Sequence, residues 1–126
     1  MVMERILIID DDKLIRWSLK ELLTGSSSLI DTAATIEDAI STAEKYSYRL
    51  IFSDIEICGQ IQSDFLFTIR KSQPEAKIII LSALSRQQIK QILGDFKIDA
   101  VLEKPYDGEK IRTLVNDFLS YDRSIK

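Results

Sequence analysis

The amino-acid sequence predicts an α/β fold in which five buried parallel strands alternate with five helices. Short apolar runs rich in β-branched residues recur along the chain, and such runs indicate strands that are buried on both faces. Stretches with helical periodicity separate these runs. The strict alternation of the two patterns favours a parallel sheet whose strands are joined by right-handed crossovers.

The first part of the chain contains two strand–helix pairs. Arg5 to Ile9 contains a continuous apolar run and predicts a strand. A helix is predicted from Asp12 to Leu23, and Thr24 to Ser27 ends it. Ser28 to Ala34 predicts a weak strand, and Thr35 caps a helix that continues to about Tyr46. The predicted inward stripes are Leu14, Ile15, Ser18, Leu19, Leu22 and Leu23 in the first helix, and Ile36, Ala39, Ile40 and Ala43 in the second.

The rest of the chain repeats the alternation three times. The predicted strands are Arg49 to Ser53, Lys77 to Leu81 and Ala100 to Glu103. The predicted helices are Ser63 to Lys71, Ser85 to Phe96 and Asp107 to about Tyr121. The simplest arrangement is a flavodoxin-like (βα)5 doubly wound sheet, with five parallel strands in the order 2-1-3-4-5 and helices on both faces. A length of 126 residues predicts one domain, residues 1–126, with no output domain.

Composition excludes several classes of function. The net charge is -3, and the 17 basic residues are dispersed, which argues against direct binding of nucleic acid by this domain. An early acidic cluster and the lack of a long apolar run predict a soluble, cytoplasmic protein with no membrane partner. The only cysteine is Cys58 and there is no histidine, so an internal disulfide, a Cys/His zinc site and a histidine base are excluded.

Polar residues gather where the predicted strands end. Parallel strands present their carboxyl ends at one edge of the sheet, and ligands bind at that edge. The residues at these ends are Asp10, Asp11, Asp12, Asp54, Ser82 and Lys104. In isolation, the first three also suit the amino-terminal cap of a helix. Clustered carboxylates without His or Cys indicate a hard cation, so we expect Mg²⁺, and an aspartate beside a metal and a lysine is a suitable phosphoryl acceptor.

Four motifs in this order resemble the receiver domains of two-component response regulators. They are ILIIDDD at the first strand, IFSDI at the third, ILSA at the fourth and LEKPY at the fifth. The resemblance covers essentially the whole chain. The stretch LIRWSLKELL is in addition similar to receivers of the nitrogen-regulatory class of enhancer-binding activators, which implies a role in transcription regulation.

The resemblance implies a phosphorylation-dependent switch. Asp54 would accept a phosphoryl group from a phosphohistidine of a histidine kinase or a histidine phosphotransfer protein. Lys104 would pair with one phosphoryl oxygen and Ser82 would hydrogen-bond another. The family also implies a cis bond between Lys104 and Pro105. The chain would catalyse only its own phosphotransfer and slow dephosphorylation, and would not be a multiple-turnover enzyme.

The resemblance also implies the metal ligands and the surfaces used. Asp11, Asp54 and the backbone carbonyl of Glu56 would bind Mg²⁺ directly, and Asp10 would hold it through water, whereas Asp12 is interpreted as the helix cap. The output face, and a homodimer interface by analogy, would comprise residues 85–96, 100–103 and the start of the last helix.

Several positions differ from the family pattern. Cys58-Gly59 stands where receivers commonly have Pro-Gly, and Gln62 replaces a later glycine, so we expect a loop of different shape. Val101 replaces the usual aromatic switch residue. Trp17 lies off the apolar stripe of the first helix and is expected to be partly exposed, either packing at the edge of the last helix or contacting the kinase.

Two other functions compete with the switch. One is a receiver-like interaction module that no longer takes phosphate, which the altered loop and Val101 suggest. The other is a Mg²⁺-dependent phosphohydrolase, for which Asp54-Ile55-Glu56 only loosely matches the required pair of acids. Intact Asp11, Asp54, Ser82 and Lys104 count against the interaction module. The place of Asp54 after the third strand rather than the first, and the lack of a substrate-capping insertion, count against the phosphohydrolase.

Overall fold

The computed structural model describes residues 4–24 and 28–124 of the chain. Its main sheet has five parallel strands in the order β2-β1-β3-β6-β7. The strands are β1 (Glu4–Ile9), β2 (Ser28–Ala33), β3 (Leu50–Asp54), β6 (Lys77–Ser82) and β7 (Ala100–Glu103). This order confirms the predicted doubly wound topology, with every predicted strand within two residues of its expected bounds.

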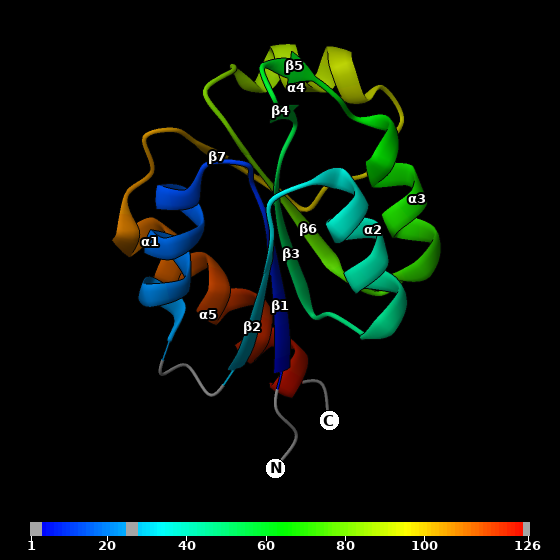
Figure 1. The fold of residues 1–126 in the computed structure, drawn as a ribbon. Coiled ribbons are helices and arrows are strands. Elements are labelled where there is room, and N and C mark those ends of the chain that lie inside the picture. The colour runs from blue at the N-terminus through cyan, green and yellow to red at the C-terminus, as the bar shows by residue number, and fades with distance from the viewer. Residues whose placement is uncertain (1–3, 25–27, 125–126) are drawn as a thin grey trace.

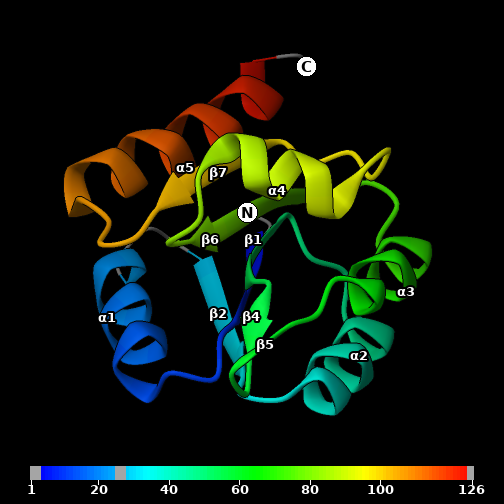
Figure 2. The same cartoon turned by 90° about the horizontal axis from the view of Figure 1, so that it is seen from above.

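Helices cover both faces of the sheet, as predicted. In Figure 1, α1 and α5 lie on one side of the sheet, whereas α2 and α3 lie on the other. The view from above in Figure 2 shows α4 crossing near the ends of β6 and β7. The bounds are α1 (Lys13–Leu23), α2 (Ile36–Lys45), α3 (Asp64–Ser72), α4 (Arg86–Leu93) and α5 (Gly108–Ser124). Among residues 4–24 and 28–124, no helix has the length and apolarity needed to cross a membrane.

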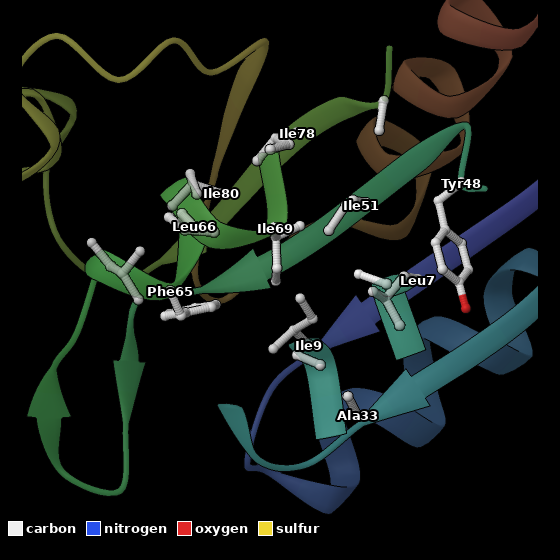
Figure 3. Packing of buried hydrophobic residues seen from close by; sticks show 14 of the residues in the cluster. Leu7, Ile9, Ala33, Tyr48, Ile51, Phe65, Leu66, Ile69, Ile78 and Ile80 are labelled. Atoms are coloured by element: carbon white, nitrogen blue, oxygen red, sulfur yellow. The ribbon is translucent and has the colours of Figure 1, made fainter. Parts of the chain in front are cut away.

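Two apolar cores form because successive residues of a strand point to opposite faces. Leu7 and Ile9 of β1 belong to the core beneath α2, α3 and α4, whereas Ile6 and Ile8 belong to the core beneath α1 and α5. Figure 3 shows the first of these, where Leu66 and Ile69 of α3 lie over the sheet. Burial on both faces explains why the strands are continuous apolar runs rather than alternating ones.

The helix ends follow local chemistry. The Asp12 side chain accepts hydrogen bonds from the backbone N–H groups of Leu14 and Ile15, and Thr35 accepts one from Asp38, so both predicted caps are confirmed. The helix predicted to reach Phe96 instead ends at Leu93. Its cap residue, Gly94, has a φ of 56°, a left-handed conformation that favours glycine and stops the helix. Residues 25–27, which belong to the predicted stop after α1, lie outside the described residues.

Leu14 was wrongly assigned to the inward stripe of α1. It is 73% exposed, and Trp17 is 62% exposed, which confirms the expected exposure of the tryptophan. At about 100° per residue, Leu14 lies about 140° around the helix from the fully buried Leu19, and Trp17 lies about 160° from it. The two exposed side chains therefore share the outer face of α1.

A small hairpin follows β3, where the sequence predicted only an altered loop. It consists of β4 (Glu56–Ile57) and β5 (Gln60–Ile61), paired antiparallel. Cys58 and Gly59 between them have φ values of 55° and 74°. Positive φ at both central residues matches the type I′ geometry that suits a two-residue hairpin. Figure 2 shows the hairpin near the centre of the view, between α1 and the α2–α3 side.

Candidate functional site

The polar residues predicted at the strand ends come together at one edge of the sheet. Asp10 and Asp11 follow β1, Asp54 ends β3, and Lys104 follows β7. In the view of Figure 1, the strands run upward to the side where the β4–β5 hairpin lies. The parallel sheet thus brings three carboxylates and one lysine, far apart in the sequence, to one place.

Lys104 connects the ends of two strands. Its Nζ atom donates to Asp10 Oδ2 at 2.9 Å and to Asp54 Oδ2 at 2.7 Å. The backbone N–H of Lys104 donates to the carbonyl oxygen of Ser82 at 2.8 Å, which continues the pairing of β6 with β7. The Lys104–Pro105 peptide bond is cis, as expected. The lysine is therefore held both through its backbone and through its ammonium group.

Burial and charge work in opposite directions on the Lys104 ammonium. Burial lowers the pKa of Lys104, but its hydrogen bonds to Asp54 and Asp10 and the charges of these carboxylates outweigh burial, so the pKa is raised above its ordinary value. Lys104 is consequently charged at neutral pH and partly neutralises the acidic cluster.

Asp10 is the most deeply buried acid of the cluster. Its side chain is inaccessible to solvent, and its Oδ1 atom accepts from the backbone N–H of Asp12 at 2.9 Å. Burial raises the pKa of Asp10, and the charge of Asp54 adds to the rise, whereas the bonds from Asp12 and Lys104 oppose it. The Arg16 guanidinium donates to the backbone carbonyl of Asp10 at 2.8 Å, a contact that no pattern in the sequence indicated.

Asp54 and Asp11 are each held by a backbone N–H of the hairpin. Asp54 is 5% exposed, and its Oδ1 atom accepts from Glu56 N–H at 2.9 Å. Asp11 is exposed, and its Oδ2 atom accepts from Cys58 N–H at 2.8 Å. The hairpin therefore contacts carboxylates from two different strands.

The donor set fits a hard divalent cation. One carboxylate oxygen from each of Asp10, Asp11 and Asp54 lies within 4.8 Å of the other two. Among the residues that the structure describes, Lys104 is the one cation hydrogen-bonded to these carboxylates, so negative charge stays uncompensated, and all three metal donors are oxygens. Mg²⁺ binds in proteins through one or two carboxylates and several waters, so these residues suit it better than a softer metal.

Ser82 lies at the end of β6 and is buried, and within the described part of the chain its hydroxyl forms no hydrogen bond with the acidic cluster. Its Oγ atom accepts from the backbone N–H of Leu84 at 3.0 Å. This hydrogen bond links Ser82 to the loop that leads into α4.

Another contact that the sequence did not indicate is a hydrogen bond between the hydroxyls of Ser18 and Tyr106, which connects α1 to the loop after β7.

The comparisons with known proteins agree with this geometry. The family model of the response regulator receiver domain matches residues 6–116. The sensory transduction protein LytT of Bacillus subtilis is 29% identical over 127 residues, which cover 98% of this chain and 51% of LytT. LytR of Staphylococcus haemolyticus is 32% identical over 114 residues, covering 87% of this chain and 43% of LytR. The chain thus spans about half the length of these relatives.

Solved structures share the fold. A CheY-like receiver domain from Methanospirillum hungatei has a TM-score of 0.87 at 22% identity, covering 99% of this chain and 100% of that one. A two-component response regulator from Clostridium difficile has a TM-score of 0.85 at 27% identity, covering 94% of this chain and 97% of that one. Sequence, fold and strand-end residues agree: the chain belongs to the response regulator receiver domain family of two-component systems.

Proposed function

We propose that Asp54 accepts a phosphoryl group from a phosphohistidine of a histidine kinase or histidine phosphotransfer protein, and that this modification switches the domain between signalling states. The observation that carries the proposal is the position of Lys104, whose ammonium lies 2.7 Å from Asp54 Oδ2 and 2.9 Å from Asp10 Oδ2. A nearly buried carboxylate that is held by a lysine and flanked by two further acids suits phosphoryl acceptance, because this reaction depends on positioning and neutralisation of charge.

The chemical step is a transfer between two nucleophiles. An Asp54 carboxylate oxygen forms a bond to phosphorus while the phosphorus–nitrogen bond of phosphohistidine breaks, and its electron pair returns to the imidazole nitrogen of the partner. Asp54 becomes an acyl phosphate. Glu56 N–H holds Asp54 Oδ1, which fixes the direction of the carboxylate, and Lys104 supplies positive charge for the phosphoryl oxygens.

The acidic residues would hold the metal. Asp11, Asp54 and the backbone carbonyl of Glu56 would be direct ligands of Mg²⁺, and Asp10 would bind it through water. Bound Mg²⁺ supplies positive charge that neutralises the transferring group.

The switch would act through Ser82 and Lys104. The phosphoryl group adds about -1.5 to -2 charges, and the Ser82 hydroxyl, which accepts from Leu84 N–H, would donate its O–H to a phosphoryl oxygen. That new bond would move the loop before α4 and shift a pre-existing equilibrium between two states. The output face, and a homodimer if one forms, would use α4, β7 and the start of α5. Phosphotransfer from a sensor kinase would take place in the cytoplasm.

The test is to incubate the chain with Mg²⁺ and acetyl phosphate, and to measure intact mass and the position of the adduct. We expect an acid-stable, base-labile adduct of one phosphoryl group on Asp54. Asp54→Asn should abolish it. Asp12→Asn is the matched control from the same acidic triplet, because asparagine also caps helices and Asp12 only caps α1.

Other outcomes would separate the competing functions. No adduct from acetyl phosphate or from any cognate kinase would overturn the switch and favour an interaction module that takes no phosphate. Repeated turnover of a small phosphomonoester would instead favour a phosphohydrolase.

A further inference from the structure

The β4–β5 hairpin contacts the acidic cluster at two points. The N–H of Glu56 donates to Asp54 Oδ1, and the N–H of Cys58 donates to Asp11 Oδ2, at 2.9 Å and 2.8 Å. These two donors are separated by Ile57, whose side chain is 2% exposed and packs in the core beneath α2, α3 and α4. The hairpin is therefore anchored in the core between its two contacts with the carboxylates.

Gln62 fastens the other side of this hairpin. Its backbone N–H donates to the carbonyl of Ile55 at 2.7 Å, and its side-chain Nε2 donates to the carbonyl of Ile57 at 3.0 Å. The two acceptors flank Glu56. Gln62 thus bonds the Ile55–Glu56 peptide, whose N–H donates to Asp54, and the Ile57–Cys58 peptide, whose N–H donates to Asp11.

We infer that Gln62 is a positioning residue for the metal and phosphoacceptor site, acting through the hairpin. Its amide holds the Ile57 carbonyl, and the neighbouring peptide N–H of Cys58 then stays aimed at Asp11. A glycine at this position would keep the backbone bond to Ile55 but would lack the side-chain bond to Ile57. This inference rests on the proposed function, and it adds to that function a residue that touches neither the metal nor the phosphoryl group.

The hydrogen-bond geometry also explains why loss of the Gln62 amide should loosen the contacts of the hairpin with both Asp54 and Asp11. The type I′ turn places Cys58 at a φ of 55°, which a non-glycine residue adopts only when its surroundings hold it there. The bonds from Gln62 Nε2 to the Ile57 carbonyl and from Cys58 N–H to Asp11 are both made by the single peptide group that precedes this turn residue. Loss of the first should loosen the second.

The test compares Gln62→Met with Gln60→Met. Methionine has a similar length but no amide, and Gln60 is an exposed glutamine of the same hairpin whose side chain makes no hydrogen bond with the described residues. The first readout is amide hydrogen exchange in the metal-free protein. We expect the N–H groups of Glu56 and Cys58 to exchange faster in Gln62→Met and to be unchanged in Gln60→Met.

The second readout is Mg²⁺ affinity by titration calorimetry, without any phosphodonor. We expect Gln62→Met to bind Mg²⁺ about three- to ten-fold more weakly, the range that follows from losing one net hydrogen bond. Unchanged affinity and unchanged exchange of both amides would overturn the inference while the proposed function stood. If the unmodified chain bound no Mg²⁺ and formed no adduct, the proposed function would itself be overturned, and the role of Gln62 with it. A purely structural role would lower only the free energy of unfolding, and that result would also count against a positioning role.

Discussion

Lys104 Nζ lies 2.7 Å from Asp54 Oδ2, although 50 positions separate the two residues in the sequence. The contact exists because β3 and β7 both end at the same edge of the sheet, separated by β6. Lys104 Nζ also donates to the buried Asp10, which follows β1, so one ammonium group partly neutralises acids at the ends of two strands.

Replacing Lys104 should destabilise the metal-free protein. Lys104→Met leaves Asp10 and Asp54 facing each other without a counter-charge, and we expect the free energy of unfolding to fall by about 2–3 kcal/mol. Urea unfolding measures the change, and added Mg²⁺ should recover part of it by binding the folded state. Lys90→Met on the exposed face of α4 is the control and should have little effect. Equal stabilities of the two variants would show that the lysine does not compensate the cluster.

Replacing Asp10 should weaken the pH dependence of stability. Its pKa is raised by burial, so the folded protein binds more protons than the unfolded chain between the two pKa values. The free energy of unfolding of the unmodified chain therefore falls as pH rises through that interval. We expect metal-free Asp10→Asn to lose less stability than the unmodified chain as pH rises from about 4 to 7, because asparagine does not titrate. A pH series of urea unfolding without metal measures this. An equal loss in both proteins would contradict the assignment.

Tyr48 should contribute to alkaline unfolding. Its hydroxyl donates to Asp31 Oδ2 at 2.6 Å, and burial, followed by this bond to a carboxylate, raises its pKa. The stability that it contributes is complete below the ordinary tyrosine pKa of about 10 and is lost as pH rises through the higher folded value. Tyr48→Phe should cost about 1 kcal/mol at pH 8 and should reduce the loss of stability at higher pH.

The control for this variant is Tyr46→Phe, which keeps the exposed ring that lies beneath Arg5. Urea unfolding at pH 8 and about pH 11 distinguishes the two variants. An identical alkaline loss in Tyr48→Phe and in the unmodified chain would refute the role of the hydroxyl. Some loss should persist in any case, because the pKa of Lys104 is raised as well.

Gln73 should be important for stability although it lies far from the acidic cluster. It is 4% exposed, its Oε1 atom accepts from Tyr48 N–H at 2.8 Å, and its Nε2 atom donates to the Ala43 carbonyl at 2.7 Å. Gln73→Leu keeps the volume but leaves both backbone groups unsatisfied, so we expect a loss of about 2–4 kcal/mol in thermal or urea unfolding. Gln91→Leu on the exposed surface of α4 is the control. Similar stabilities for both variants would show that the bonds of Gln73 to Tyr48 and Ala43 do not stabilise the connection between α2 and β3.

Much of the fold follows from the sequence because hydrophobic periodicity reports local structure directly. The apolar run at Ile6 to Ile9 needs burial on both faces, so it predicts a strand of a covered parallel sheet. Caps such as Asp12 and Thr35 act within three residues, so their chemistry is also visible in the sequence. The strand-end positions of Asp10, Asp54 and Lys104 follow from the alternation alone.

Only the tertiary structure decided which atoms meet. Periodicity identifies the face of a helix or strand but not its partner, so the contacts of Arg16 with Asp10 and of Gln73 with Tyr48 had no signal in the sequence. Helical periodicity predicted Leu14 on the inward stripe, but the buried side of α1 is the side that carries Leu19, and Leu14 lies outside it. The positive φ of Cys58 likewise depends on the hairpin that holds it, because a non-glycine residue reaches that conformation through its surroundings and not through its own preference. The sequence by itself determined the elements and the acids at their ends, whereas packing between distant strands decided how those acids are paired, oriented and held.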